Sequence, residues 1–415
     1  MIMDEPIVVG IDIGTTKICT LVARVEGERN LRILGVGIEP AQGMRRGAVV
    51  DLQAASQAIA RSVEKAERSS GLEITSALVS LAGANVASVN SRGVVGIAGR
   101  AITQDDIDRA LDAAQAVAIP HAREIIHVIQ RGFTIDGEGG IRTPIGMHGY
   151  RLEVEAHIIT AASATVENLR QCVEAAGVSV VQFVLNPLAS AEVVLNDTER
   201  QMGAVVVDIG GGTTDMAIYI EGDIWHTAVI PVGGNLITSD IAQGIHLPIT
   251  VAEDIKKQYG YAIENDVDAS ETFSVRSFGE EKPVQVSRKD LAMIIEARVA
   301  EIFDLVLAEI KRSGYDGLLP AGVVLTGGVC NLPGIRSLGT QILRLPVQIV
   351  KPENLVGLVD QLHSPAYSTS VGLLYWALIM NDSESPAPRR GGSRIRAEGG
   401  TGWEKFSRFL RSLLP

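Results

Sequence analysis

Apolar residues in the first half of the chain occur in short β-branched runs that alternate with longer stretches of helical periodicity. The short runs predict strands at Val8–Ile13, Ile18–Val25, Leu31–Glu39, Ser76–Ala82 and Val178–Leu185. The longer stretches predict helices at Leu52–Ser69, Thr165–Ala176 and Leu188–Leu195. Strands that alternate with helices predict an α/β core.

Two stretches interrupt this alternation and are interpreted as inserted subdomains. The first, about Gly83 to Thr160, has strand-like runs at Val86–Ile97, Glu124–Ile135 and Arg151–Ile159. It also has a helix that Thr103 caps, with an acidic first turn. The second, about Gly244 to Leu319, ends in a long amphipathic helix that begins at Ser287 and has Asp290 as part of a capping box.

One motif occurs twice, at Ile7–Lys17 (IVVGIDIGTTK) and Ala204–Asp215 (AVVVDIGGGTTD). Each copy is a β-branched run, an aspartate and a Gly/Thr turn. A run of this kind predicts a strand buried on both faces, with the aspartate where the strand ends. The repetition indicates that the chain contains two similar halves.

The turns of both copies have the residue types that hold phosphate. Glycines allow consecutive backbone N–H groups to approach an anion, and threonines add hydroxyl donors. Asp12 and Asp208 would repel phosphate, but they suit Mg²⁺, which prefers carboxylate oxygen and retains water. One such turn alone is equally typical of a plain hairpin. Two copies with matching aspartates favour a nucleotide, and neither copy has the P-loop or the G-x-G-x-x-G spacing.

A third glycine turn follows the strand Val323–Leu325, in Thr326–Ile335 (TGGVCNLPGI). Gly327 and Gly328 have no side chain, so they can pass beneath a base or a ribose. A structural strand–helix turn fits this segment equally well.

Composition places the chain among globular proteins of several domains, with 415 residues and 46% hydrophobic content. Three scattered cysteines and the absence of a basic-then-apolar leader predict a reducing cytosolic compartment. No apolar run reaches the roughly 18 residues of a membrane span. The net charge of −12 argues against nucleic-acid binding.

The C-terminal tail has the opposite charge: from Arg389 onward, seven basic residues stand against two glutamates. Residues 381–401 are rich in Pro, Gly, Ser and Arg and predict a flexible linker. Residues 402–415 predict a short amphipathic helix for the interface of an anionic membrane. Its apolar face is Trp403, Phe406, Phe409, Leu410, Leu413 and Leu414, and its basic residues are Lys405, Arg408 and Arg411. A disordered basic tail and a helix docked on the body of the protein are the alternatives.

The ordered set GIDIGTTK, VDIGGGTTD and VLTGGVCNLPGI resembles the superfamily of actin, sugar kinases and heat-shock chaperone ATPases. With Asn186–Val194 (NPLASAEVV), Ile230–Asp240 (IPVGGNLITSD), the insertion after Ala82 and the amphipathic tail, the chain resembles the FtsA family of bacterial cell-division proteins over nearly its whole length. The resemblance implies an α/β, actin-like two-lobed ATPase fold with one inserted subdomain in each lobe. The expected domains are the first-lobe core (1–82 and 162–202), its insertion (83–161), the second-lobe core (203–244 and 320–380), its insertion (245–319), the linker (381–401) and the terminal helix (402–415).

The resemblance also implies ATP and Mg²⁺ in the cleft between the lobes. Around the phosphates it places Asp12, Gly14, Thr15, Thr16 and Lys17 of the first turn, and Asp208, Gly210, Gly211, Gly212 and Thr213 of the second. Gly233 and Gly234 join the cofactor-binding set, and Gly327 and Gly328 face the adenosine. Glu253, Lys256 and Lys257 have the spacing that clasps the nucleoside in related chaperones, although such charge clusters are also common on ordinary helices.

Asn186 departs from the pattern of the superfamily. Several of its ATPases orient the attacking water with a Glu or Gln at the equivalent strand end, whereas this chain has Asn186 before Pro187. A carboxamide is not a general base and this one reaches less far, so we expect it at most to position water, and hydrolysis to be slow.

The resemblance to this family implies partners as well. The chain is expected to assemble into actin-like filaments, to bind the inner face of the cytoplasmic membrane at the division site, and to recruit later division proteins through the first insertion. The C-terminal tail of FtsZ is expected to dock on the second insertion, where the candidates are Arg276, Lys282, Arg288, Lys289 and Arg298. Each of these is also explained as a solvated charge. A small-molecule kinase and a pilus-assembly relative are the rival interpretations.

Overall fold

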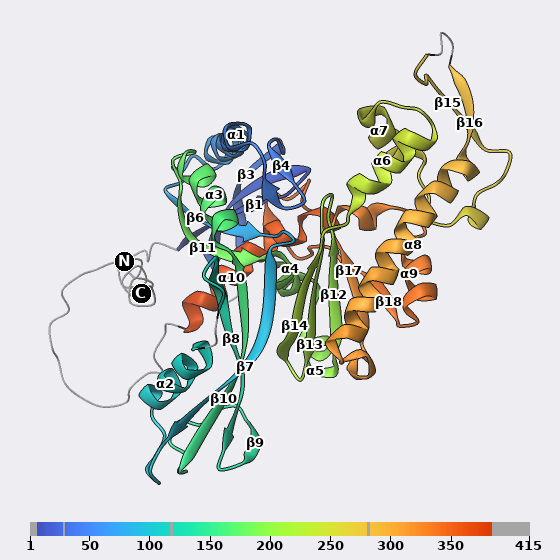
Figure 1. The fold of residues 1–415 in the computed structure, drawn as a ribbon. Helices are drawn as coiled ribbons and strands as arrows, with labels where there is room; N and C mark the ends of the chain where they lie inside the picture. Colours follow the sequence, from blue (N-terminus) through green and yellow to red (C-terminus); the bar gives the residue numbers. More distant parts are fainter. Residues whose placement is uncertain (1–5, 28–29, 117–118, 280–282, 384–415) are drawn as a thin grey trace. The chain divides into compact units, whose positions relative to one another are not determined.

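Two mixed sheets form the core of the protein in the computed structural model, which describes residues 6–27, 30–116, 119–279 and 283–383 (Figure 1). They share one strand order, apart from an additional edge strand in the first. The first sheet has the order β11-β6-β1-β2-β3-β19. Its strands are β1 (Ile7–Ile13), β2 (Lys17–Glu26), β3 (Asn30–Pro40), β6 (Ser76–Leu81), β11 (Ser179–Leu185) and β19 (Val356–Gly357). We call this sheet and its helices the first lobe.

The second sheet has the order β14-β13-β12-β17-β18 and belongs to the second lobe. Its strands are β12 (Ala204–Ile209), β13 (Thr214–Ile220), β14 (Asp223–Ile230), β17 (Gly322–Thr326) and β18 (Val347–Ile349). In both sheets an antiparallel three-strand meander is followed by parallel strands on the far side of its first strand. The duplicated sequence motif therefore reflects a duplicated sheet, with β12 in the place of β1.

Helices cover both faces of each sheet, which explains why β1 and β12 are almost continuously apolar. In the first lobe, α1 (Leu52–Ser70) and α3 (Ser163–Glu174) cover one face and α10 (Ser368–Ser383) the other. In the second lobe, one face is covered mainly by α6 (Gly234–Gly244), α8 (Arg288–Ser313) and α9 (Ile335–Leu343), and the other by α4 (Asn186–Val194). The short α5 (Asp197–Met202) connects α4 to β12.

The first insertion is a four-stranded antiparallel sheet with one helix packed on it. The sheet has the order β7-β10-β8-β9. Its elements are β7 (Val86–Gly96), α2 (Gln104–Gln115), β8 (Arg123–Ile135), β9 (Glu138–Ile141) and β10 (Arg151–Ala162). The predicted N-cap is confirmed, since Thr103 and Asp106 form a capping box at the start of α2.

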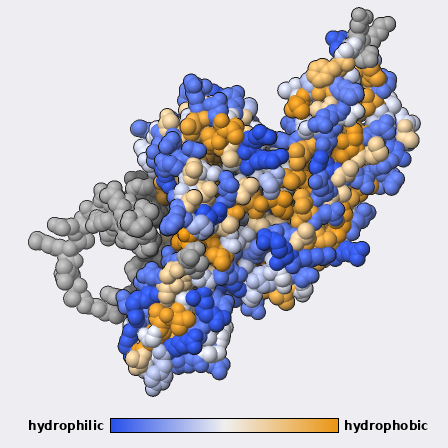
Figure 2. Space-filling model, viewed as in Figure 1, coloured by the Kyte–Doolittle hydropathy of each residue, from blue (hydrophilic) through white to orange (hydrophobic). Residues whose placement is uncertain are grey.

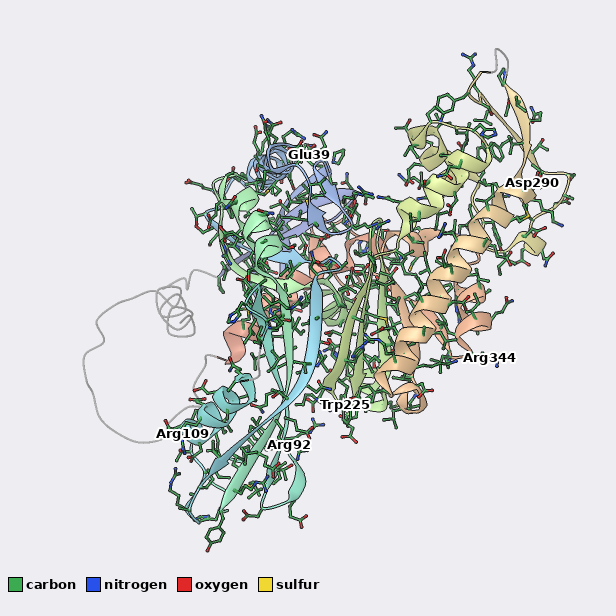
Figure 3. The ribbon with its side chains drawn as sticks, in the orientation of Figure 1. Glu39, Arg92, Arg109, Trp225, Asp290 and Arg344 are labelled. Atoms are coloured by element: carbon green, nitrogen blue, oxygen red, sulfur yellow. The ribbon has the colours of Figure 1, made fainter. Side chains whose placement is uncertain are left out.

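Although it is inserted in the first lobe, this subdomain contacts β14 of the second. Ser88 Oγ donates to the carbonyl oxygen of Thr227 over 2.9 Å, and His157 Nε2 lies 3.0 Å from Thr227 Oγ1. The guanidinium of Arg131 stacks 4.0 Å from the ring centroid of Trp225, which Figure 3 labels. Burial lowers the pKa of His157 to about 3, so this junction is polar but uncharged at the histidine.

The second insertion comprises α7, a small hairpin and α8. Its elements before α8 are α7 (Ile249–Tyr259), the 3₁₀ turn η1 (Glu264–Asp266), β15 (Thr272–Val275) and β16 (Val284–Ser287). The predicted cap of the long helix is present, because Ser287 Oγ accepts from Asp290 N over 3.3 Å. Apolar residues gather along α8 on the face shown in Figure 2, and Met293 and Leu305 are exposed large apolar side chains of this helix.

Several predicted element ends are shifted or incomplete. The helix expected to start at Leu188 begins at Asn186, and α10 continues to Ser383, three residues into the predicted linker. The pattern did not predict the small hairpin of β4 (Met44–Arg45) and β5 (Ala48–Val49) or the strand β9. Further 3₁₀ turns are η2 (Asp316–Leu318), η3 (Gly328–Asn331) and η4 (Pro365–Tyr367).

Among the described residues, no helix is both long enough and apolar enough to cross a membrane.

Candidate functional site

The first predicted phosphate turn is a four-residue hairpin loop. Ile13 of β1 pairs with Ile18 of β2, which leaves residues 14–17 as the loop. Within it, Gly14 N donates to the carbonyl oxygen of Lys17 over 2.9 Å.

The second predicted turn repeats this geometry between β12 and β13. Ile209 pairs with Thr214, and Gly210 N donates to the carbonyl oxygen of Thr213 over 2.9 Å. In both loops the two central residues, Thr15–Thr16 and Gly211–Gly212, have no partner for their N–H groups within the described part of the chain. Four backbone donors are thus available to an anion.

Both loops line one cavity of about 600 Å³. This volume lies within the range of about 300–1,000 Å³ that is usual for small-molecule and cofactor sites. Of the cofactor-binding residues predicted from sequence, the cavity is lined by Gly14, Thr15, Thr16, Lys17, Gly210, Gly211, Gly212, Thr213, Gly234, Glu253, Lys256, Lys257, Gly327 and Gly328. Gly233 is not among the lining residues: it packs behind the second turn, where a Cβ would lie 2.6 Å from the carbonyl oxygen of Gly210.

Asp12 is buried and held by three neighbours at the end of β1. Ser80 Oγ donates to Oδ1 over 3.1 Å, and Ser370 Oγ donates to Oδ2 over 2.6 Å. Lys17 Nζ lies 3.3 Å from Oδ2. Although burial lowers the pKa of Lys17, the charge of Asp12 raises it above its ordinary value. The first turn is therefore stabilised by an internal ion pair at the cavity wall.

Asp208 is held less strongly. Thr369 Oγ1 donates to its Oδ2 over 2.8 Å. Burial, with a smaller contribution from the charge of Asp12, raises the pKa of Asp208 to about 6, although the hydrogen bond from Thr369 opposes the shift. Without a bound cation, a charged Asp208 is thus unfavourable in this position.

Asp215 lies directly across the hairpin from Asp208 and also lines the cavity. Thr213 Oγ1 donates to Oδ2 over 2.9 Å, but Oδ1 is buried and has no hydrogen-bond partner in the structure. Burial raises the pKa of Asp215 well above its ordinary value, and the charge of Asp208 adds to this. A buried carboxylate oxygen without a donor fits a site that water or a cation completes.

The third glycine turn approaches the second one closely. Gly327 has φ +91°, and a Cβ there would lie 2.4 Å from Asp208 Oδ1 and 2.5 Å from the carbonyl oxygen of Ile209. The neighbouring Gly328 is open, with only the Ala366 Cβ at 3.8 Å. Only Gly327 therefore requires glycine here, and it does so because of backbone conformation and close approach.

Glu253, Lys256 and Lys257 form one cluster on α7. Lys256 Nζ lies 2.6 Å from Glu253 Oε2, and Lys257 Nζ lies 3.2 Å from Oε1. Lys256 also donates to Thr238 Oγ1 over 2.8 Å and to the carbonyl oxygen of Gly234 over 3.2 Å. Its side chain is 14% exposed, whereas that of Lys257 is 68% exposed. Lys256 is thus part of the wall of the cavity, and Lys257 stands at its rim.

Asn186 lines the cavity from the first turn of α4, and its buried Oδ1 has no hydrogen-bond partner among the described residues. Glu192, further along the helix, is engaged elsewhere, since Arg200 Nη1 donates to its Oε1 over 2.9 Å. Glu192 therefore belongs to a partly buried ion pair.

Four candidates for partner binding lie in described parts of the second insertion. Arg298 pairs with Asp240 through Nε at 2.6 Å, Lys289 Nζ lies 3.8 Å from Glu264 Oε1, and Arg288 pairs with Glu271. Arg276 is exposed and has no such partner among the described residues. Lys282 lies outside the described residues, as do the predicted membrane residues Trp403, Lys405, Phe406, Arg408, Phe409, Leu410, Arg411, Leu413 and Leu414.

Sequence reasoning did not assign several residues of the site: Ser80, Asp215, Thr369, Ser370 and Gly47, whose N donates to Thr15 Oγ1 over 3.2 Å. Asp215 had a signal, because a hairpin with a four-residue loop places it opposite Asp208. The hydroxyls of α10 had none, since they are brought to the site by tertiary structure alone.

Twin hairpin loops on duplicated sheets, facing one cavity, define an actin-like fold. Over 92% of its length the chain is similar to MreB5 of Spiroplasma citri bound to ADP, of which it covers 100% (TM-score 0.55, 16% identity). It is also similar to a chain of the PilM–PilN type IV pilus biogenesis complex (TM-score 0.63, 16% identity), with 90% of this chain and 98% of that chain covered.

The chain belongs to the FtsA family of cell-division proteins. A family model described as cell division protein FtsA matches residues 205–372, and one described as the SHS2 domain inserted in FtsA matches residues 83–160. The chain is 43% identical to cell division protein FtsA of Pseudomonas aeruginosa, with 89% of each chain covered. It is 41% identical to that of Neisseria meningitidis (97% of each) and 35% identical to that of Escherichia coli K12 (98% of each). The predicted family and fold class are confirmed.

Proposed function

We propose that the cavity binds ATP, and that the chain uses it as a ligand for assembly rather than as a fuel for rapid turnover. The observation that supports ATP is the pair of matching loops with four unpartnered backbone N–H groups at one cavity. Such groups hold phosphate oxygens without introducing negative charge. The third glycine turn and the cluster of Glu253 and Lys256 line the same cavity, and the nucleoside is proposed to lie against them.

Mg²⁺ is proposed to accompany the nucleotide. The described residues contain no group of three or more His, Cys, Asp or Glu side chains arranged to hold a metal directly. Asp12, Asp208 and Asp215 would therefore hold it through water, with the phosphates as direct ligands, as is usual for Mg²⁺ in nucleotide sites. The unpartnered Oδ1 of Asp215 and the raised pKa of Asp208 both fit a site that gains a cation. When bound, the metal would neutralise phosphate charge.

In cell division, the chain is proposed to tether FtsZ filaments to the inner face of the cytoplasmic membrane at the division site. Three further properties belong to this proposal: self-assembly into actin-like filaments, recruitment of later division proteins through the first insertion, and slow hydrolysis of ATP. The membrane anchor is proposed from sequence alone, on the segregation of Trp403–Leu414 into apolar and basic faces. Membership of the FtsA family does not favour the rival small-molecule kinase.

The FtsZ tail is proposed to dock on the second insertion, where its acidic groups would meet basic residues. Among the described candidates, Arg276 would need no rearrangement, because it is exposed and unpaired in the described part of the chain. Arg298, by contrast, already pairs with Asp240 and Glu301, so a tail carboxylate would have to displace one of them.

Co-sedimentation with anionic liposomes tests the tethering proposal. The full chain and a chain ending at Gly400 are compared with Mg-ATP, with EDTA and with neutral liposomes. We expect the full chain to pellet and the shortened chain to remain in the supernatant. A larger fraction of the full chain should pellet with Mg-ATP, because a filament presents many weak membrane anchors at once. Pelleting that does not depend on the tail would contradict the anchor, and failure of both chains to bind ATP would contradict the nucleotide site.

A further inference from the structure

The small hairpin that sequence reasoning missed has an unusual turn. Met44 pairs with Val49 and Arg45 with Ala48, so Arg46 and Gly47 alone connect β4 and β5. Their φ values are +50° and +75°. A two-residue loop with positive φ at both positions matches the type I′ pattern, which strongly prefers Asn, Asp or Gly at its first position. Arginine at that position is disfavoured, and backbone strain of this kind concentrates at ligand sites.

The tip of this hairpin packs against both phosphate turns. Gly47 N donates to Thr15 Oγ1 over 3.2 Å, and Gly47 lines the cavity. A Cβ on Gly212 of the second turn would lie 2.3 Å from Thr15 Oγ1 and 3.0 Å from Arg46 Cα. The backbone of Arg46 is therefore fixed beside the place where the turns of the two lobes meet, and only glycine at position 212 allows this approach.

The side chain of Arg46 has no role in the structure that would explain the strained turn. It is exposed, and it makes no hydrogen bond or ion pair within the described part of the chain. The nearest buried carboxylate of the first turn, Asp12, is already engaged by Ser80, Ser370 and Lys17. Arg46 is not among the residues that line the cavity, but its backbone lies beside two loops with free backbone donors. A change of rotamer would direct the unpaired guanidinium to a phosphate bound there, to which arginine can donate two parallel hydrogen bonds.

The position of the hairpin tip relative to the cavity indicates which phosphate of a nucleotide Arg46 would contact. Glu253 and Lys256 line the cavity from the insertion of the second lobe, whereas Gly47 and Ala82 line it from the first lobe. A nucleotide with its nucleoside against α7 would direct its terminal phosphate toward Gly47 and the hairpin tip.

We propose that Arg46 binds the terminal phosphate of ATP and thereby makes the cavity distinguish ATP from ADP. This inference rests on the proposed nucleotide site and adds to it a residue for nucleotide-state recognition. In the ADP complex the guanidinium has no γ-phosphate to contact. The interlobe contact at the hairpin tip would then be supported by Arg46 only when ATP is present.

Arg46→Gly tests this in the full chain, because glycine keeps the left-handed turn while it removes the guanidinium. Affinities for Mg-ATP and Mg-ADP are measured by calorimetry, with circular dichroism to verify the fold. Loss of a charge-assisted hydrogen bond predicts about 10- to 100-fold weaker ATP binding, with ADP binding changed less than about twofold. Arg46→Lys should recover part of the ATP affinity, since it restores the charge without the bidentate geometry.

Arg68→Ala is the matched control, since Arg68 is an exposed arginine on α1 whose ion pair in the described structure is with Glu64, one helical turn away. It should change neither affinity. Equal losses for ATP and ADP in Arg46→Gly, or no loss for either, would overturn the role of Arg46 while leaving the nucleotide site intact. If the unchanged chain binds neither nucleotide, the proposed function itself fails, and this inference with it.

Discussion

Ser370 in α10 donates a hydrogen bond to Asp12 at the end of β1, over 2.6 Å and across 358 positions of sequence. The preceding residue, Thr369, donates to Asp208 at the end of β12 over 2.8 Å. Two adjacent hydroxyls thus hold the equivalent aspartates of both lobes. The same helix packs by Val371 and Leu374 against the first sheet. The start of α10 is therefore a structural connection between the two phosphate turns.

Ser370→Ala should destabilise the protein, because Asp12 is buried and would lose a donor to its carboxylate. Removing one partner of a buried, charged hydrogen bond costs about 1–3 kcal/mol. Urea denaturation of the ligand-free chain measures this as a fall in the free energy of unfolding. The control is Ser274→Ala on the exposed side of β15. Its free energy of unfolding should stay within about 0.5 kcal/mol of that of the unchanged chain. Equal stability of the two variants would show that Ser370 does not hold Asp12.

Gly327→Ala and Gly328→Ala should differ strongly although they are adjacent. At Gly327 the φ of +91° and the approach of Asp208 and Ile209 leave no room for a methyl group, so the second phosphate turn must shift. At Gly328 a Cβ meets nothing nearer than 3.8 Å. We expect Gly327→Ala to lose about 2–4 kcal/mol of stability and its ATP-induced stabilisation.

Thermal melts with and without Mg-ATP measure both effects. Gly328→Ala should keep a normal melting temperature and the normal ATP-induced increase. A Gly327→Ala variant that melts normally and still responds to ATP would contradict the close contact between the third turn and Asp208.

Because of Asp208, the ligand-free protein should become less stable as the pH rises through the mildly acidic range. Its pKa is about 6 in the folded chain, against an ordinary value of 3.8. Between these values the folded chain binds more protons than the unfolded one, so the contribution of Asp208 to stability is lost as pH rises from about 4 to about 6. Full ionisation of Asp208 in the folded chain lowers the free energy of unfolding by about 2–3 kcal/mol.

The isosteric variant Asp208→Asn isolates this effect, because it retains the shape and removes the charge. Its free energy of unfolding should match that of the unchanged chain near pH 4 and exceed it by about 2–3 kcal/mol at pH 7. Carboxylates with a lowered pKa, such as Asp106, act in the opposite sense but cancel in this difference. The variant should also lose the stabilisation by Mg-ATP. A difference that is independent of pH would show that Asp208 is not protonated in the folded state.

Much of this architecture was predictable from the sequence, for reasons that are local. Strands β1 and β12 are recognisable because both of their faces are covered, and Thr103 and Ser287 mark helix starts through hydrogen bonds within one turn. Gly211, Gly212 and Gly327 are recognisable because the close approach of neighbouring atoms requires glycine there. All of these signals lie within a few residues of the feature that they predict.

What the sequence did not predict depends on distant residues. Thr369 and Ser370 appear as ordinary small polar residues until α10 brings them to Asp208 and Asp12. The β4–β5 hairpin was missed because Arg46 occupies a position where a turn normally has Asn, Asp or Gly. The proposed phosphate-binding role of Arg46 would explain why an arginine stands there and why the usual turn residue is missing.

Asn186 should limit the rate of ATP hydrolysis, and Asn186→Glu should raise it. The side chain lines the cavity from the N-terminus of α4, and its buried Oδ1 has no partner in the part of the chain that the structure describes. Asn186 is therefore free to orient a water, but it is not a base. A carboxylate one methylene longer would reach further and accept a proton. General-base catalysis typically contributes about 100-fold or more, and an unoptimised base should give at least about tenfold.

Phosphate release under single-turnover conditions measures this rate. Glu192→Gln, on the same helix but paired with Arg200 outside the lining of the cavity, should not change it. Hydrolysis that stays equally slow in Asn186→Glu, with normal ATP affinity, would mean that a different step or a missing partner limits the reaction.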